Sequence, residues 1–294
     1  MQLTRQQATL LIFLTLTWGF NWPVMKLGVM DFPPLTFRAI SIWLGLPVLG
    51  LAMVLMKVPF TIPRDKWREL FVLALTNMFV WHALIILAVK NLSSGRAAIL
   101  GYTMPIFSAV LGALFFGAQL RRRNWLGVAA AALGVLLLLW NELTAMSGKP
   151  LGVLCALVAA AVWAYGTQRL RVTPIKAATL TIAFWMIALT AAVLSVLSAI
   201  FEMPQWKAPS ATNWGSILYN AVLIFGFAHA AWFSLVRSLP PIASTLSVMM
   251  IPILGVFSGA LWLGEVLHWQ DWTAVGLMVL AIASVLWPVP RSQT

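Results

Sequence analysis

The sequence predicts an all-α membrane protein of ten transmembrane helices, built as two five-helix repeats of opposite orientation. Three observations predict it: an apolar composition, a succession of long apolar runs, and a repeat that relates the two halves of the chain. Of the 294 residues, 62% are hydrophobic and 9% are charged, whereas ordinary soluble domains carry about 25% charged residues. A chain of this composition cannot cover itself with polar side chains in water, so we expect a lipid bilayer to surround it.

The apolar runs have the length of membrane-spanning helices. About 20 helical residues span the roughly 30 Å of hydrocarbon in a bilayer. The runs show no alternation of period two, which favours helices over the strands of a transmembrane barrel. Loops with proline, glycine or serine separate most of them. We expect helices at residues 8–28, 34–56, 68–89, 95–117, 124–143, 150–170, 176–200, 214–236, 241–263 and 271–288.

Basic residues predict how this bundle is oriented. Of the 19 lysines and arginines, 13 fall at the end of the predicted bundle that holds both termini and six fall at the other end. Because cytoplasmic loops carry the excess of basic residues, both termini are expected in the cytoplasm, with the protein in the inner (plasma) membrane. The net charge of +12 then reports topology, and no nucleic-acid partner is expected.

Internal repetition is the most informative feature of the chain. A shift of 147 residues superimposes two stretches over some fifty positions, and a shift of 145 places Trp18 on Trp163. Pairs matched by the longer shift are His82 with His229, Pro105 with Pro252, Gly112 with Gly259 and Gly117 with Gly264. Five helices per half is an odd number, so the second half must be inverted. We expect repeats at 1–146 and 147–294, an architecture typical of secondary transporters that bind substrates between the repeats.

Several local patterns resemble one transporter family. They are Trp18-Gly19-Phe20-Asn21 with Lys26, Pro34 with Arg38, and a helix that contains Pro105 and ends at Gly117. Together they are similar to EamA-type transporters of the drug/metabolite transporter superfamily, and the opening Thr4-Arg5-Gln6-Gln7-Ala8-Thr9-Leu10 looks like that of bacterial aromatic amino-acid exporters. The second half departs from the pattern, with Ala164 where Gly19 stands and no clear match to Arg38.

The resemblance implies a transporter that exports small neutral or zwitterionic metabolites by alternating access. Amino acids with aromatic or apolar side chains are the first expectation, and another metabolite or a drug is the alternative. We expect a small-molecule substrate and the lipid bilayer as partners, no cofactor or metal, and a functional monomer. Other function classes are an intramembrane enzyme and an accessory subunit. The enzyme is disfavoured because the sequence has no GxSxG, HExxH or paired intramembrane aspartate.

Candidate substrate-binding residues are the polar and aromatic side chains inside the predicted helices. Ionisable groups within a membrane are costly and usually functional, although two repeat-related histidines could also be inherited packing residues. Aromatic rings in the same region can stack on a ligand or fill the core. The set comprises Trp18, Asn21, Asn77, Trp81, His82, Tyr102, Trp163, Tyr165 and His229.

The fourth and ninth predicted helices carry small residues and a proline. Gly112 and Gly117, with Gly255 and Gly259, form faces that permit close helix packing, and a homodimer contact is the rival use. Pro105 and Pro252 are candidate gating hinges or static kinks, because proline removes a helical hydrogen bond.

Charged residues complete the expectations. Arg38 and Lys26 are expected near the outer mouth, where they would snorkel or attract a substrate carboxylate. The seven acidic residues all map to helix ends or loops, so no carboxylate proton relay is expected. Facilitated diffusion and proton coupling through His82 and His229 stay open as alternatives.

Overall fold

The computed structural model of the chain describes residues 4–117, 119, 122–144, 149–235 and 241–286, with the side chains of 142, 233–235, 241–247, 285 and 286 left aside. Throughout these ranges the chain forms helices and loops, with no strand. Eight helical segments in the described residues are long and apolar enough to cross a membrane, and 248–263 adds a shorter apolar helix. The all-α membrane fold is therefore confirmed.

The described helices make ten passes through the bundle. In chain order they are α1 (Arg5–Val29); α2 (Pro34–Leu55); η1 (Arg64–Lys66), α3 (Trp67–Leu73), η2 (Ala74–Phe79) and α4 (Val80–Asn91); α5 (Ser94–Gly101) and α6 (Met104–Phe116); α7 (Arg122–Thr144); α8 (Pro150–Arg171); α9 (Thr179–Phe201), followed by the short turn η3 (Met203–Gln205); α10 (Ala211–Leu218), η4 (Tyr219–Ala228) and α11 (His229–Leu235); α12 (Pro241–Leu263); and α13 (Trp269–Leu286). Each pass begins and ends within four residues of the predicted helix.

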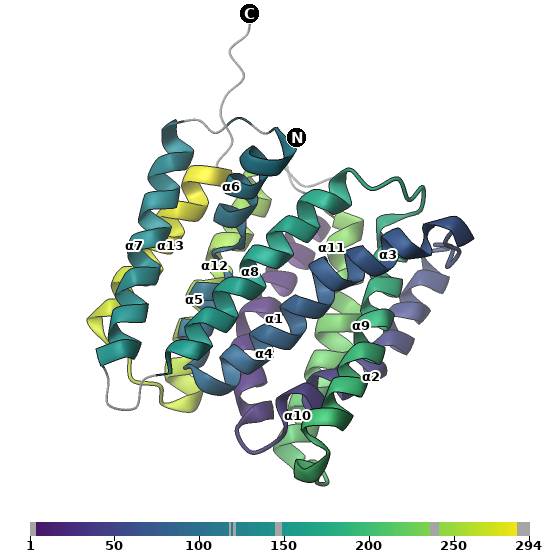
Figure 1. The fold of residues 1–294 in the computed structure, drawn as a ribbon, viewed down its shortest axis with the longest axis horizontal. Helices are drawn as coiled ribbons and strands as arrows, with labels where there is room; N and C mark the ends of the chain where they lie inside the picture. The colour runs from purple at the N-terminus through teal and green to yellow at the C-terminus, as the bar shows by residue number, and fades with distance from the viewer. Residues whose placement is uncertain (1–3, 118, 120–121, 145–148, 236–240, 287–294) are drawn as a thin grey trace, which may run out of the picture.

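Neighbouring helices come largely from opposite halves of the chain. Contacts join α1 with α12, α2 with α9 and η4, α4 with α8, and α7 with α13. Figure 1 shows α7 beside α13 at one edge of the bundle and α2 beside α9 at the other. The core therefore lies between the halves rather than inside each.

The two ends of the bundle are named by the helices that begin or end there. We call the end where α1 begins and α13 ends the terminal end, and the end where α2, α5 and α13 begin the far end (Figure 1). Because each pass crosses the bundle, both ends of the bundle contain starts of some helices and ends of others.

The third pass of each half contains a π-helix. η2 covers Ala74–Phe79, and the 147-residue shift maps it onto 221–226, inside η4. π-helices are rare and are often found at functional sites. The repeat thus extends to irregular backbone, which the expected continuous helices over 68–89 and 214–236 did not include.

The fourth pass is interrupted, which corrects the expected continuous helix over 95–117. α5 ends at Gly101, and α6 begins anew with Pro105 in its first turn. Thr103 Oγ1 donates to the Leu100 carbonyl at 2.6 Å and offers the backbone an alternative to the helical bond. α12 runs through Pro252 without a break. Pro105 thus follows a break in the helix, and the low helix propensity of Gly101 favours that break. No such break precedes Pro252, the residue that the repeat matches with Pro105.

Three of the four glycines expected to pack helices lie in contact regions. Gly112 is buried in α6. A Cβ added to Gly255 would lie 2.9 Å from the Cβ of Ala98, and one added to Gly259 would overlap the hydroxyl of Ser94. The close approach of α12 to α5 therefore depends on these two glycines.

Gly117 has a different role from the one expected. It ends α6 in the left-handed conformation, with φ 69°, and nothing lies within 4 Å of the position that a Cβ would take. Gly264 follows α12 with φ 63° and equally open surroundings. Both are helix caps, because glycine adopts positive φ without steric cost.

Candidate functional site

A phenylalanine lies between the two histidines that the repeat relates. His82 of α4 has its ring centroid 5.2 Å from that of Phe225 in η4, and His229 of α11 stacks on the same ring at 6.0 Å with an interplanar angle of 14°. The structure therefore brings both predicted histidines to one ring, which the sequence did not single out.

The two histidines differ in hydrogen bonding. His229 Nδ1 lies 2.8 Å from the carbonyl oxygen of Ile224. Because a carbonyl only accepts, Nδ1 carries the proton in that bond. His82 is 6% exposed, and neither ring nitrogen has a partner among the described residues. A buried polar ring without partners is costly, and this marks His82 as available to a ligand.

Arg38 contacts the same phenylalanine ring and is buried, which corrects the expected place at the outer mouth. Its side chain is 1% exposed. Nη1 donates to Asn220 Oδ1 at 3.1 Å and Nη2 to Met25 Sδ at 2.7 Å. The guanidinium carbon lies 5.7 Å from the centroid of Phe225. Sequence reasoning could have found it by the rule that marks ionisable groups inside apolar helices as functional.

Two tryptophan pairs join the first pass of one half to the third pass of the other. Trp163 of α8 and Trp81 of α4 have centroids 6.3 Å apart. Trp18 of α1 and Trp232 of α11 have centroids 5.6 Å apart. The repeat-related Trp18 and Trp163 thus each pack on a tryptophan in the third pass of the opposite half. The 147-residue shift does not match Trp81 with Trp232.

The π-helices are tied across the halves in a similar way. Asn77 Nδ2 in η2 donates to the Trp163 carbonyl at 3.3 Å and to Thr167 Oγ1 at 2.9 Å. Tyr219 Oη in η4 donates to the Thr17 carbonyl at 2.7 Å. Each third pass is therefore bonded to the first pass of the other half.

Aromatic rings also converge on the break between α5 and α6. Tyr102 lies at the break, with its ring 6.2 Å from that of Trp22. A Cβ on Gly101 would lie 2.8 Å from Trp22 and 3.3 Å from Trp81, so glycine makes room for both rings. Asn21, next to Trp22, is buried with its Oδ1 unpartnered among the described residues.

Tyr165 is the candidate that the structure places elsewhere. Its ring lies 5.8 Å from Phe116 and 6.4 Å from Phe115, at the end of α6. It therefore does not share the contacts of Trp163, its neighbour in α8.

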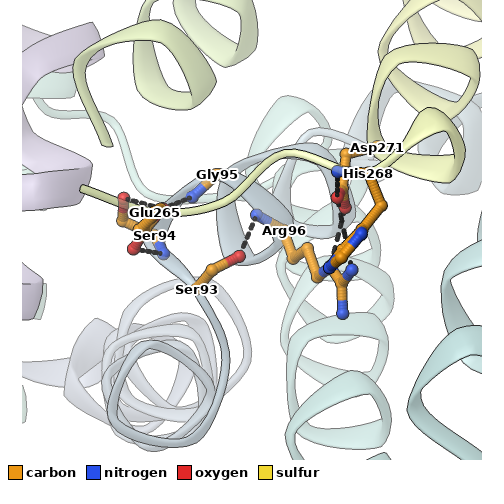
Figure 2. A network of polar contacts seen from close by, with 7 residues as sticks. All are labelled: Ser93, Ser94, Gly95, Arg96, Glu265, His268 and Asp271. Atoms are coloured by element: carbon orange, nitrogen blue, oxygen red, sulfur yellow. Dashed lines mark hydrogen bonds and ion pairs between the residues drawn. The ribbon is translucent and has the colours of Figure 1, made fainter. Parts of the chain in front are cut away.

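At the far end, carboxylates of the second half bind the start of α5. Figure 2 shows Glu265 beside Ser94 and Gly95, and Asp271 beside Arg96. Glu265 accepts from Ser94 N at 2.6 Å, Ser94 Oγ at 2.9 Å and Gly95 N at 3.2 Å. Arg96 Nε lies 2.6 Å from Asp271 Oδ1. A carboxylate at a helix N-terminus satisfies free N–H groups and the helix dipole.

The start of α2 is capped in the same manner. Glu202, which follows α9, accepts from Leu35 N at 2.9 Å and from Thr36 N at 2.7 Å. Two helices of the first half thus begin on carboxylates of the second.

Two lysines cap helix ends within the first half. Lys26 Nζ of α1 donates to the carbonyls of Val89, Lys90 and Leu92 at 2.7–3.1 Å. Lys90 of α4 in turn donates to the carbonyls of Val29 and Met30 at the end of α1. The far end is therefore closed by charged side chains on helix ends.

Two hollows lie toward the terminal end. A largely apolar hollow of about 290 Å³ lies between α1, α2, η4 and α11, and a second, of about 420 Å³, is lined by charged residues that include Glu69 and Arg169. Within the described part of the chain, no three His, Cys, Asp or Glu side chains gather as a metal site.

Comparison with known proteins finds relatives that are transporters. The Bacillus subtilis (strain 168) protein YoaV, an uncharacterized transporter, is 26% identical over 87% of this chain and 88% of its own. The uncharacterized inner membrane transporter YedA of Escherichia coli (strain K12) is 27% identical over 94% of this chain and 89% of its own. A probable amino-acid metabolite efflux pump of the same strain is 25% identical over 90% and 89%.

The fold also has a solved counterpart. A protein of known crystal structure superposes with a TM-score of 0.65 at 20% identity, covering 95% of this chain and 97% of that chain. The EamA-like transporter family matches residues 7–140 and again 150–287. With two copies of the family's unit in one ten-pass helical bundle, the chain belongs to the EamA-like transporter family and is a multi-pass membrane transporter.

Proposed function

We propose that the protein exports amino acids with aromatic or apolar side chains by alternating access. The halves that move are residues 1–146 and 147–294, and the monomer is the working unit. The protein lies in the inner membrane with both termini in the cytoplasm, because the sequence assigns 13 of the 19 basic residues to the predicted helix ends and loops on the side of the termini.

The observation that carries the proposal is the buried centre around Phe225. Rings of both halves meet there, because His82 of the first half contacts Phe225 of the second, which stacks on His229, and no described residue satisfies the ring nitrogens of His82. Ligand sites combine apolar walls with a few polar groups that orient the ligand. The similar Escherichia coli protein described as a probable amino-acid metabolite efflux pump supports the substrate class.

The two ends support a direction of access. Carboxylate caps hold the far end, whereas the residues that line both described hollows lie toward the terminal end. With the termini in the cytoplasm, this conformation is closed to the outside, and a cytoplasmic substrate reaches the buried site after the terminal end opens further.

The test is efflux from liposomes that contain the purified protein. They are loaded with an equimolar mixture of phenylalanine, leucine, glutamate and lysine. We expect efflux of phenylalanine and leucine well above that of the two charged amino acids. Equal rates for all four, or no protein-dependent efflux, would contradict the proposal.

A matched pair of variants tests the site. Trp81→Ala removes a ring that packs on Trp163, and Trp125→Ala removes one that is 57% exposed on α7. We expect at least about a tenfold loss of efflux for Trp81→Ala, because a buried aromatic contributes about 2 kcal/mol or more, and little change for Trp125→Ala. Equal losses would leave Trp81 with a packing role only.

We also infer that no carboxylate relay drives transport. The described carboxylates near the bundle, Glu202, Glu265 and Asp271, bind helix starts or Arg96. Transport down the substrate gradient is therefore expected. A pH gradient imposed on liposomes without a substrate gradient tests this, with the His82→Gln, His229→Gln double variant as control. Uphill accumulation that persists in the double variant would contradict the inference.

A further inference from the structure

Arg38 is a buried charge whose described partners are all neutral. They are an amide oxygen, a thioether sulfur and two aromatic rings, from Asn220, Met25, Phe37 and Phe225. Its Nε has no partner among the described residues, and no described carboxylate pairs with it. A buried charge without an opposite charge is strongly destabilising.

Other cations in the bundle are compensated. Arg96 holds Asp271 with two nitrogens, at 2.6 and 3.2 Å, and Arg169 holds Glu69 at 2.7 and 3.1 Å. Lys26 and Lys90 bind carbonyls at helix C-termini, where the helix dipole favours a cation. The bundle therefore supplies acceptors for its other described intramembrane cations.

The local helix does not compensate Arg38. It lies at the fifth residue of α2, near the positive end of the helix dipole, which disfavours a further positive charge. Glu202 caps that helix, but its two oxygens accept from Leu35 N, Thr36 N and Thr36 Oγ1. The guanidinium thus retains an unused donor in a site that is poor in negative charge.

We propose that Arg38 binds the carboxylate of the transported substrate. This rests on the proposed export of amino acids and names the group that recognises their common anionic end. A guanidinium presents a planar fork of donors that matches a carboxylate, and Nε belongs to one edge of that fork. The rings of Phe37 and Phe225 beside it suit an apolar portion of the same ligand. Since Arg38 is 1% exposed, the carboxylate reaches it in a more open conformation of the transport cycle.

Binding to the detergent-purified wild type is the first measurement. The probes are phenylacetate, its neutral isostere phenylacetamide, and chloride, and the readout is the shift in thermal unfolding midpoint over a concentration series. We expect phenylacetate to bind about tenfold or more tightly than phenylacetamide, since a charge-assisted hydrogen bond is lost in the amide. No preference for the carboxylate would overturn the proposal. A chloride response equal to that of phenylacetate would also overturn it, in favour of a free inorganic anion.

Two variants locate the effect. Arg38→Gln removes the charge and should bring the ratio of the affinities for phenylacetate and phenylacetamide close to one. Asn220→Asp retains Arg38 and places a carboxylate at the atom that now accepts from Nη1. This internal counter-ion should raise the unfolding midpoint without ligand and abolish the response to phenylacetate. Asn220→Asp therefore tests the proposal even if Arg38→Gln does not fold.

The control is Lys207→Gln, which removes an exposed cation near Asp31 and should keep the wild-type preference. A preference that persists in folded Arg38→Gln or in Asn220→Asp would overturn the proposal. Liposome efflux separates the two levels of inference. Arg38-dependent phenylacetate binding without amino-acid efflux would remove the proposed substrate and keep the carboxylate site. Amino-acid efflux with no carboxylate preference would remove the carboxylate site at Arg38 and keep the proposed substrate.

Discussion

The two ends of the bundle are held together by different chemistry. At the far end, Glu202 and Glu265 of the second half bind backbone N–H groups at the starts of α2 and α5. At the terminal end, the described contacts between halves include neutral bonds, from Thr181 to the Pro59 carbonyl at 2.6 Å and from Trp185 to the Phe60 carbonyl at 2.7 Å. Charge-assisted hydrogen bonds are roughly twice as strong as neutral ones, so the far end is the harder one to open.

The ion pairs repeat this contrast. Arg96 and Asp271 at the far end are 12% and 4% exposed, whereas Arg169 and Glu69 at the terminal end are 34% and 18% exposed. A partly exposed pair is screened by water and salt and contributes little. Under the proposed alternating access, the far end would be closed at rest, and a few carboxylates would set the free-energy cost of opening it.

The largest expected effect comes from removing one far-end cap. Glu265→Gln should lower the free energy of unfolding by about 2 kcal/mol, because three charge-assisted bonds to Ser94 and Gly95 are weakened. Glu69→Gln, the matched change at the terminal end, should cost no more than about 1 kcal/mol. Unfolding in bicelles measures both. Equal losses would show that the two ends do not differ as described.

Two capping glycines give an intermediate effect and a sharper comparison. Gly117→Ala and Gly264→Ala both force alanine into positive φ, which costs about 1 kcal/mol. Gly264→Ala should cost more, because Gly264 precedes Glu265 and sets its path to α5. In a Glu265→Gln background, the two alanine substitutions should then cost the same. A difference that persists in that background would mean that Glu265 is not its cause.

The smallest effect concerns two loop carboxylates. At the far end, a hydrogen bond from Asn213, at 3.0 Å, lowers the pKa of Asp31. At the terminal end, the Lys66 ammonium lowers the pKa of Asp65. Because salt screens a charge more than a neutral amide, high salt should return the pKa of Asp65 toward its usual value and leave that of Asp31 low.

Carboxyl carbon NMR titration measures both groups. Asn213→Ala should raise the pKa of Asp31 toward the unfolded value. A lowered folded-state pKa gives stability that is present above the unfolded pKa and is lost as pH falls through the folded pKa. Asn213→Ala should therefore reduce the acid sensitivity of folding slightly. An unchanged Asp31 titration in this variant would assign the shift to another cause.

The helices and the repeat could be predicted from the sequence because side-chain type and spacing indicate both. It did not reach the π-helices or the break before Pro105, because those depend on which backbone groups bond. The structure also separates Tyr165 from Trp163. Residues two apart in an α-helix point about 160° apart, so Tyr165 and Trp163 lie on nearly opposite faces of α8.

The missed residues depend on contacts between distant parts of the chain. Phe225 is one of 16 phenylalanines, and only its position against His82, His229 and Arg38 distinguishes it. The acidic residues were expected at helix ends or loops, but the helix starts that Glu202 and Glu265 bind lie in the other half. No local pattern encodes such a pairing, so the caps of α2 and α5 could be seen only in the fold.

Those caps have a consequence for how the protein is made. The carboxylates that cap α2 and α5 lie 167 and 171 positions later in the chain than the residues they bind. At a synthesis rate of about 5–20 residues per second, the first half waits in the membrane for roughly ten to thirty seconds before its caps emerge. During that interval, lipid headgroups and water must accept hydrogen bonds from the free N–H groups at the starts of α2 and α5. The starts of α2 and α5 therefore acquire these caps only after Glu202 and Glu265 of the second half have been synthesised.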